Sequence, residues 1–341
     1  MPGYVPTPLT ELPEFARELG VRRVLVKDES LRFDLPAFKI LGVSWALSRV
    51  LAARAGDPGT PPSFDRLQES ARQLAPLELV CATDGNHGRA LARMATSLGL
   101  ESCVHVPDSL NPAAIDAIER EGATVVQSPG GYDVAVVRAA EHASSGANRL
   151  LIQDTAWPRY EEIPGWIVEG YSTLFHEIDE QVDGAAVNLI VVPTGVGSLL
   201  QAAVAHSRRD GIASPPAVVA VEPDRAACIQ ASLQAGHLTT IETSHTVMAG
   251  LNCGTGSALA WPVIANGLDA AVAVSDDHAL AAMADLRAAG IDAGPCGAAS
   301  LAGARTALTG PGANLRRTHL GISADSVVVL VSTDGRASGA G

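Results

Sequence analysis

One lysine stands where it could act as a nucleophile. Lys39 follows a β-branched run, and Asp34 can cap a helix whose first turn would accept Pro36, with apolar residues then following at helical spacing. The sequence therefore predicts Lys39 within the first turns of an apolar helix. Such a location disfavours the ammonium form and leaves a neutral amine that can form an imine with an aldehyde. The alternative is a structural lysine whose stem lies on a buried helix and whose amine reaches solvent.

A glycine-rich segment has the composition of a phosphate-binding loop. Gly195-Val196-Gly197-Ser198 follows an apolar run and precedes a helical pattern. Consecutive backbone N–H groups in such a turn can point at one anion. The segment is no Walker loop, and Leu200 stands where a dinucleotide fingerprint has its third glycine. A nicotinamide enzyme stays open, because Glu222 ends the next strand and could bind a ribose, and so does a tight turn without a ligand.

A third segment, Thr83-Asp84-Gly85-Asn86-His87-Gly88, also ends a strand and opens a helix. It presents a hydroxyl, a carboxylate, an amide and backbone N–H groups together, which can hold a carboxylate. Asn86 could donate to a phenolate oxygen, and Asp84 could bind an ammonium or move a proton. The alternative is an ordinary helix cap in which Asp84 or Thr83 caps. His87 by itself is interpreted as structural.

Alternating elements must position these segments. Apolar β-branched runs, most with the pattern of strands buried on both faces, alternate with stretches of helical periodicity, which predicts an α/β fold with parallel sheets flanked by helices. The predicted strands are 24–26, 79–82, 103–106, 124–127, 150–153, 189–192, 218–221, 271–274 and 327–331. The predicted helices are 88–98, 113–121, 134–144, 161–182, 199–206 and 276–289.

The chain is long enough for two domains. We expect residues 46–171 to form a smaller α/β domain, inserted into a larger cofactor-binding domain built from 1–45 and 172–341, with the active site in the crevice at the carboxyl ends of the strands. The segment Ala55–Ser63, rich in glycine and proline, is interpreted as a surface loop.

Composition narrows the function class. The chain has 341 residues, 47% of them hydrophobic, and 37 acidic against 24 basic side chains give a formal charge of −13. That charge would repel nucleic acid, and the chain shows neither a signal-peptide pattern nor a long apolar run, so we expect a cytoplasmic protein without nucleic-acid or membrane partners. The five cysteines and nine histidines form no Cys-x-x-Cys or His-Glu-x-x-His pattern, which predicts no metal site.

The three segments occur in the order seen in the tryptophan synthase β family, the fold type II enzymes that use pyridoxal 5'-phosphate. Further segments extend the resemblance over nearly the whole chain, and together they make it similar to the diaminopropionate ammonia-lyases. These segments are Lys27-Asp28-Glu29-Ser30-Leu31-Arg32-Phe33, Ala37-Phe38-Lys39, Ala82 to Arg89, Gln153-Asp154-Thr155-Ala156-Trp157, Tyr160-Glu161-Glu162-Ile163-Pro164, Glu222-Pro223-Asp224-Arg225-Ala226, Met248-Ala249-Gly250-Leu251 and Ser332-Thr333-Asp334-Gly335.

The resemblance implies roles for individual residues. Lys39 would be the imine lysine, and the cofactor would also contact Asn86, Gly195, Val196, Gly197, Ser198, Ser332 and Thr333. A neutral hydroxyl at the pyridine nitrogen, from Ser332 or Thr333, leaves the ring less protonated than a carboxylate would. That setting suits β-elimination, in which the leaving group departs quickly.

The resemblance also implies a substrate. Asp84 corresponds to the base for D-2,3-diaminopropionate and Asp154 to the base for the L isomer, with Thr83, Gly85 and His87 contributing to the substrate site. The products would be pyruvate and ammonia. A serine or threonine dehydratase and a β-replacement synthase are the alternatives within the fold, but the dehydratases usually carry a small residue where this chain has Asp84. Enzymes of this fold are commonly homodimers.

Two stretches depart from the family pattern. Gly294-Pro295-Cys296-Gly297-Ala298 stands where the family generally has Gly-Glu-Ser-Gly-Ala, and Asp34-Leu35-Pro36 replaces a run such as Gly-Leu-Asn. These departures leave open a catalytically silent relative that binds the cofactor or an amino acid. Cys228 and Cys253 fall in two segments where some family members carry a disulfide, and we expect free thiols because cytosolic disulfides are uncommon.

Overall fold

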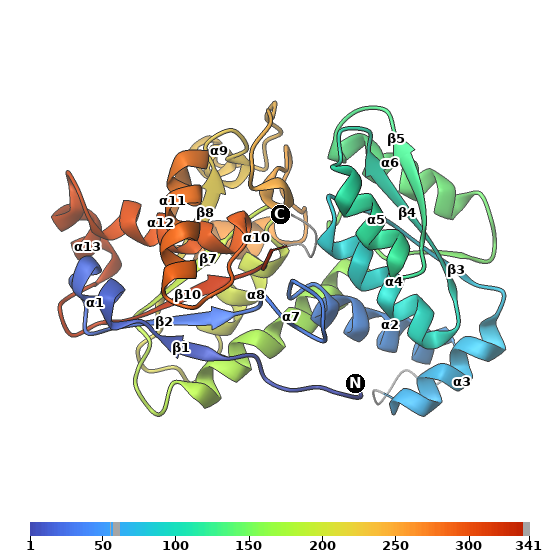
Figure 1. Cartoon of the computed structure of the whole chain (residues 1–341), viewed down its shortest axis with the longest axis horizontal. Coiled ribbons are helices and arrows are strands. Elements are labelled where there is room, and N and C mark those ends of the chain that lie inside the picture. The colour runs from blue at the N-terminus through green and yellow to red at the C-terminus, as the bar shows by residue number, and fades with distance from the viewer. Residues whose placement is uncertain (55, 57–61, 337–341) are drawn as a thin grey trace. The chain divides into compact units, whose positions relative to one another are not determined.

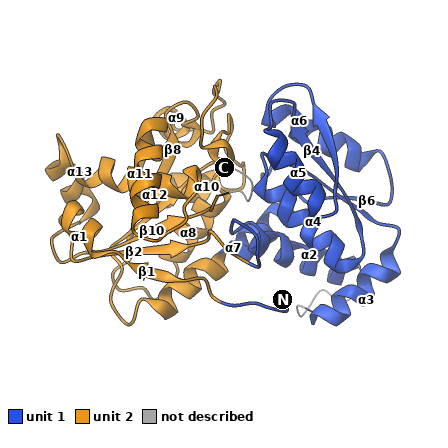
Figure 2. Cartoon of the chain, viewed as in Figure 1, with its two compact units in different colours: residues 1–5, 33–171, 337–341 blue, residues 6–32, 172–336 orange. Residues whose placement is uncertain are grey.

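The computed structural model describes residues 1–54, 56 and 62–336, so that most of the predicted loop Ala55–Ser63 lies outside the described residues. The chain divides into two compact units, coloured separately in Figure 2. Unit 1 comprises Met1–Val5 and Phe33–Tyr171, and unit 2 comprises Pro6–Arg32 and Ser172–Arg336. The domain assignment made from the sequence stays a prediction.

Unit 1 is built on a parallel sheet of four strands in the order β5-β4-β3-β6 (Figure 1). Helix α6 packs on β3 and β4, while α4 also contacts these strands and packs against α2. The strands are β3 (Glu78–Ala82), β4 (Glu101–Pro107), β5 (Thr124–Ser128) and β6 (Arg149–Leu151). The helices are α2 (Ile40–Arg54), α3 (Phe64–Leu74), α4 (Asn86–Leu98), α5 (Pro112–Arg120) and α6 (Tyr132–Ser144).

Unit 2 is built on a six-stranded sheet in the order β1-β2-β10-β7-β8-β9, parallel except for β1. Its strands are β1 (Leu9–Glu11), β2 (Arg23–Asp28), β7 (Leu189–Pro193), β8 (Ala217–Pro223), β9 (Ala270–Val274) and β10 (Val327–Ser332). Its helices are α1 (Pro13–Leu19), α8 (Ser198–Ser207), α9 (Cys228–Ala235), the short η1 (Ala249–Leu251), α10 (Trp261–Gly267), α11 (Asp276–Ala288), α12 (Pro295–Leu308) and α13 (Ala313–Leu320). Helix α7 (Glu162–Gln181) begins in unit 1 and ends in unit 2.

The core of unit 2 follows from strand alternation. Alternate residues of the central strands, such as Val191, Val219 and Leu330, join one apolar cluster with side chains of α1, α11 and α12. The intervening residues point to the opposite face, because successive side chains of a strand alternate, and α8 packs on β7 and β8. With helices on both faces, the central strands β7 and β10 are buried along their whole length.

The predicted fold class is confirmed, and each of the nine predicted strands overlaps an observed one. The strand β1 was not predicted, because three residues are too few for a periodic pattern. Burial on both faces is wrong for β5, which is mostly exposed because it is an edge strand. Among the described helices, none combines the length and apolarity needed to cross a bilayer.

The predicted start of the helix that was expected to contain Lys39 is wrong. Phe33 and Asp34 have φ angles of 53° and 61°, so this stretch turns in the left-handed region, and α2 begins only at Ile40. Asp34 therefore does not cap the helix, and Pro36 lies outside its first turn. Lys39 ends the turn that precedes α2.

Candidate active site

Lys39 forms an ion pair within unit 1. Its Nζ lies 2.5 Å from Oδ2 of Asp154, and its side chain is 21% exposed. Phe38 and Tyr171 place their rings 5.4 Å and 5.9 Å from the same nitrogen, which gives the amine an aromatic wall. A carboxylate at this distance favours the ammonium form of a lysine. The neutral amine expected from the sequence stays a prediction for the protein with its ligand bound.

Asp84 and Asp154 follow neighbouring strands. Asp84 lies in the loop after β3, and Asp154 lies just beyond β6, which pairs with β3 in parallel. The carboxyl ends of parallel strands share one edge of a sheet, and the two carboxylates interact electrostatically there. The structure thus places in one cluster the lysine and both aspartates that the sequence predicted.

The two carboxyl groups have opposite pKa shifts. Burial, and then repulsion from Asp154 and Asp133, raises the pKa of Asp84 to about 7. Burial also acts to raise the pKa of Asp154, but the charge of Lys39, then His87, and the hydrogen bond from Lys39 outweigh it and lower that pKa to about 2. Neighbouring groups with separated pKa values can divide the acid and base roles of a reaction between them.

Other side chains orient this cluster. His87 Nε2 lies 2.7 Å from the carbonyl oxygen of Ile152, which can only accept, so this nitrogen carries the proton. Its Nδ1 lies 3.7 Å from Oδ2 of Asp154 and has no hydrogen-bond partner among the described residues. Burial lowers the pKa of His87, so the ring is neutral and presents an acceptor. The amide of Gln153 donates to the hydroxyl oxygen of Tyr132 at 2.9 Å and to Oδ1 of Asp154 at 3.3 Å.

The segment Thr83 to Gly88, called the asparagine loop below, leads into α4 without a side-chain cap. The N-cap is Gly85, with φ of 137°, and no side chain accepts from the first turn of the helix. The Thr83 hydroxyl instead accepts from the backbone N–H of Gly85 at 2.9 Å and shapes the loop. The cap interpretation of Asp84 and Thr83 is therefore wrong. Asn86 begins the helix, and the N–H groups of its first turn lack intrahelical acceptors, as an anion site requires.

In unit 2 the segment Gly195 to Ser198, called the glycine loop below, joins β7 to α8. Gly197, with φ of 95°, is the N-cap of α8, and again no side chain accepts from the first turn. A Cβ at Gly197 would lie 2.9 Å from Cδ1 of Ile264, and one at Gly195 would lie 3.1 Å from the carbonyl oxygen of Gly250. The left-handed φ of Gly197 disfavours a side chain there, a Cβ at Gly195 would be tightly packed, and Ser198 starts a helix whose N-terminus favours an anion.

Ser332 is the last residue of β10, and Thr333 follows it. Strand β10 lies next to β7 in the sheet. Both are buried, and neither Ser332 Oγ nor Thr333 Oγ1 has a hydrogen-bond partner among the described residues. An unpaired buried hydroxyl costs free energy, so such groups at the carboxyl edge of a sheet are suited to a ligand. These two hydroxyls are the orphaned groups that a ring nitrogen would satisfy.

Asp334 was not predicted as a site residue, although the sequence motif contains it. Its Oδ1 accepts from the backbone N–H of Gly297 at 2.6 Å, in the first turn of α12. Burial raises the pKa of this carboxyl to about 6, against the opposing hydrogen bonds from Gly297 and Cys296. Asp334 therefore caps α12 from a distant part of the chain. Pro295 is the first residue of that helix, where the missing N–H costs nothing, which accommodates this departure from the family pattern.

Lysine scarcity is a signal that sequence reasoning missed. The chain has only two lysines, Lys27 and Lys39. Lys27 is completely buried, its Nζ lies 2.6 Å from Oε2 of Glu177, and it donates to the carbonyl oxygen of Thr7 and to Oε1 of Gln181, both at 2.7 Å. All three donors of Lys27 are thus used, and Lys39 is the lysine side chain positioned to react.

Comparison with known proteins identifies the family. The family model described as pyridoxal-phosphate dependent enzyme matches residues 1–334. The diaminopropionate ammonia-lyase of Escherichia coli (strain K12) is 32% identical over 343 residues, covering 98% of this chain and 85% of that protein. The chain belongs to the diaminopropionate ammonia-lyase family of pyridoxal-phosphate dependent enzymes.

Solved structures of that family superpose on this fold. The crystal structure of the Escherichia coli diaminopropionate ammonia-lyase in complex with D-serine matches with a TM-score of 0.88 and 31% identity, covering 99% of this chain and 86% of that chain. The structure of the same enzyme with an aminoacrylate-PLP azomethine reaction intermediate matches with a TM-score of 0.84 and 30% identity, with the same coverage. Pyridoxal phosphate is accordingly the cofactor of this protein.

The residues present fit this cofactor. The glycine loop is tightly packed around its glycines and presents the backbone N–H groups of a helix start, as a phosphate requires. The orphaned hydroxyls of Ser332 and Thr333 can face a pyridine nitrogen. Cys228 and Cys253 lie beside Gly195 and form no disulfide, as expected, and Sγ of Cys228 donates to the carbonyl oxygen of Gly195 at 3.9 Å.

Proposed function

We propose that this protein is an ammonia-lyase that uses pyridoxal phosphate to remove the β-amine of 2,3-diaminopropionate or of a close β-substituted amino acid. The reaction breaks the Cα–H and Cβ–N bonds, and hydrolysis of the resulting enamine consumes one water. Each diaminopropionate thus gives one pyruvate and two ammonia molecules. The sequence and structural similarity to diaminopropionate ammonia-lyases supports this assignment.

The observation that carries the proposal is the pair of aspartates beside Lys39. The pKa of Asp84 is raised to about 7 and that of Asp154 is lowered to about 2, although both lie at the same edge of the sheet. A carboxyl group with a pKa near 7 can exchange protons at neutral pH, and an ionised partner can hold a cation. Elimination of an amine needs a group that exchanges protons, because a proton leaves Cα. It also needs an ionised carboxylate, because the leaving amine is basic and carries a positive charge.

When bound, pyridoxal phosphate supplies an electron sink for the charge that develops at Cα. Asp154 stays ionised at neutral pH and holds the amine of Lys39 in position. Asp84 removes the Cα proton from one face of a D substrate, and Asp154 does so from the other face of an L substrate. The Escherichia coli relative crystallised with D-serine supports a site that admits D amino acids.

The remaining residues hold the substrate and the cofactor. Backbone N–H groups at the start of α4, with Thr83 and Gly85 shaping the loop, bind the substrate carboxylate. Asn86 donates to the cofactor phenolate, and the neutral His87 presents Nδ1 as an acceptor. The carboxylates also favour a substrate with two ammonium groups over serine or threonine. We further propose that the protein is cytoplasmic and forms a homodimer. Size-exclusion chromatography with light scattering will test the oligomeric state.

A substrate panel tests this function. We expect the purified holoenzyme to release pyruvate and ammonia from D- and L-2,3-diaminopropionate with a higher kcat/KM than from serine, threonine or O-acetylserine. Preference for serine or threonine would instead establish a dehydratase. A protein that binds the cofactor and turns over none of these compounds would be a silent relative, and the proposal would fail.

A further inference from the structure

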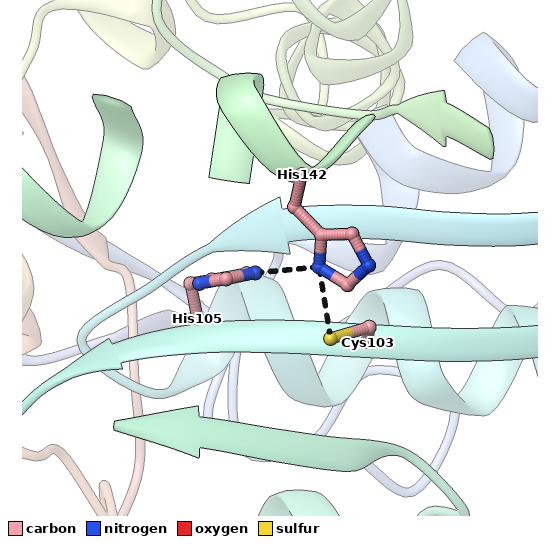
Figure 3. Close-up of side chains that lie close together, drawn as sticks. All are labelled: Cys103, His105 and His142. Carbon is pink, nitrogen blue, oxygen red and sulfur yellow. Dashed lines mark hydrogen bonds between the residues drawn. The ribbon is translucent and has the colours of Figure 1, made fainter. Parts of the chain in front are cut away.

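A second cluster of reactive side chains lies in unit 1, on β4 and α6. Cys103 and His105 are two residues apart on β4, so their side chains share one face of the sheet. His142 reaches them from α6, which packs across this face. Figure 3 shows that both contacts converge on the same nitrogen, Nδ1 of His142.

The distances are close to those of a metal site. His105 Nε2 lies 2.8 Å from His142 Nδ1, and Cys103 Sγ lies 3.5 Å from the same nitrogen, with one ligand atom of each residue within 4.8 Å of the others. Tetrahedral zinc, with bonds of about 2.0–2.1 Å to nitrogen and about 2.3 Å to sulfur, separates its ligand atoms by roughly 3.3–3.6 Å. The sulfur is therefore already at ligand spacing from Nδ1 of His142, and the two imidazoles need to part by only about half an ångström.

Each ring has a nitrogen that can present a lone pair to a metal ion. His105 Nε2 and His142 Nδ1 share one hydrogen bond, so an ion that binds both nitrogens displaces its proton to another ring nitrogen, such as the buried Nδ1 of His105, which has no hydrogen-bond partner among the described residues. A coordinating metal ion deprotonates a thiol directly. Binding would thus release the thiol proton.

A carboxylate lies beside the second ring nitrogen of His142. Glu78, on β3, places Oε2 at 3.3 Å from Nε2 of His142, the ring nitrogen that faces away from the cluster. The same oxygen accepts from Nε of Arg149 at 2.8 Å, which fixes its position. Histidines that bind metals commonly donate their other N–H to a carboxylate, and Glu78 lies close enough to Nε2 of His142 to take this role.

The cluster can be reached from solvent on this side. Cys103 and His105 are buried, but the side chains of His142 and Glu78 are 22% and 24% exposed. Glu78 and Arg149 also line a surface pocket of about 420 Å³. An ion can therefore enter past His142 while the thiol stays protected.

We propose that Cys103, His105 and His142 bind a divalent transition-metal ion of the zinc class, with water as the fourth ligand. One sulfur and two imidazole nitrogens are a donor set that favours Zn²⁺ over Mg²⁺ or Ca²⁺. The ion ties α6 to β4 and so stabilises unit 1. The sequence predicted no metal site, because the third ligand lies 37 residues beyond His105 and reaches it only through the packing of α6 on the sheet.

A competing cluster in unit 2 provides the control. His176, Asp179 and His206 also place ligand atoms within 4.8 Å of one another. Here Nη2 of Arg209 lies 2.7 Å from Oδ2 of Asp179, so a cation already occupies the carboxylate. We expect no tight zinc binding at this second cluster, and the exposed His176 allows it to be disrupted by His176→Gln.

The test is a zinc titration of the holoenzyme after treatment with a chelator. Zinc would be measured by elemental analysis after gel filtration, and its affinity by competition with a chromogenic chelator. We expect one zinc per chain, an affinity at least ~10-fold weaker in Cys103→Ser and His142→Gln, roughly 10- to 100-fold weaker in Glu78→Gln, and unchanged in His176→Gln. With Co²⁺, ligand-field bands beyond the cofactor absorption should report four-coordinate geometry in the wild type and be lost in Cys103→Ser.

Circular dichroism and cofactor absorbance would establish that each variant is folded. Zinc should raise the unfolding temperature of the wild type and of His176→Gln, but not that of His142→Gln. The proposal fails if zinc is retained equally by wild type and by the Cys103→Ser/His142→Gln double variant, or if binding is lost in His176→Gln. Should Cys103→Ser not fold, an unchanged affinity in Glu78→Gln and His142→Gln would still overturn it.

Discussion

The carboxyl group of Asp84 imposes a stability cost that grows with pH. Its pKa is about 7 in the folded protein, against an ordinary value of 3.8, because of burial and then the repulsion from Asp154 and Asp133. A carboxyl with a raised folded pKa contributes its full stability below about pH 4, and that contribution is lost as the pH rises through about 7. A difference of about 3 pH units corresponds to roughly 4 kcal/mol, at about 1.36 kcal/mol for each unit.

Asp84→Asn removes this charge and keeps the shape of the side chain. In urea unfolding of the cofactor-free protein, we expect the variant to be more stable than the wild type, and its gain near pH 8 should exceed its gain near pH 5 by about 2–3 kcal/mol. The exposed Asp116 on α5 of the same unit offers a matched control, because Asp116→Asn should show no such pH dependence.

The same substitution should cost activity. Loss of a general base lowers turnover by about 10²- to 10⁴-fold, so Asp84→Asn should lose at least ~100-fold in kcat toward D-diaminopropionate. A stability gain equal at the two pH values would refute the electrostatic reasoning, and turnover of the D isomer at the wild-type rate would refute the role as base. The variant is thus expected to be more stable and less active, as for other charged groups held in a catalytic site.

Three further substitutions test other parts of the account. Asp154→Asn should destabilise the cofactor-free protein by about 2 kcal/mol at neutral pH, because the pKa of this carboxyl is lowered to about 2 in the folded protein. The loss should disappear as the pH falls from about 4 through about 2, and urea unfolding at several pH values measures it. Gly197→Ala should cost about 1–3 kcal/mol and weaken cofactor binding, since φ is 95° and the new Cβ would meet Ile264; unfolding and a pyridoxal phosphate titration check both effects. Asp334→Ala should cost about 1–2 kcal/mol of unfolding free energy through loss of the cap on Gly297, and an unchanged midpoint in urea would contradict that role.

The sequence predicted the central strands well for a physical reason. Strands such as β7 and β10 are buried on both faces, so each is a continuous apolar run that ends at a glycine or a hydroxyl residue. The start of α2 could not be predicted in the same way. Asp34 and Pro36 have the chemistry of a helix start, but the left-handed turn at Phe33 and Asp34 overrides it.

The relation between Asp84 and Asp154 could be predicted only in part. Their identities and approximate roles followed from resemblance, but their opposite pKa shifts depend on β6 pairing with β3, two strands far apart in the chain. The ion pair of Lys39 with Asp154, and the cap that Asp334 provides to α12, likewise depend on tertiary packing. Spacing in the sequence contains no information about these distances.

The central claim is that Lys39 is the lysine that bonds to pyridoxal phosphate, and the chain's two lysines make it directly testable. Borohydride reduction of the holoenzyme, followed by proteolysis and mass spectrometry, would locate the reduced pyridoxyl group. We predict one modified site, at Lys39, with Lys27 unmodified because its three donors are used within the protein. A pyridoxyl group on Lys27, or a fully loaded holoenzyme with neither lysine modified, would contradict the account.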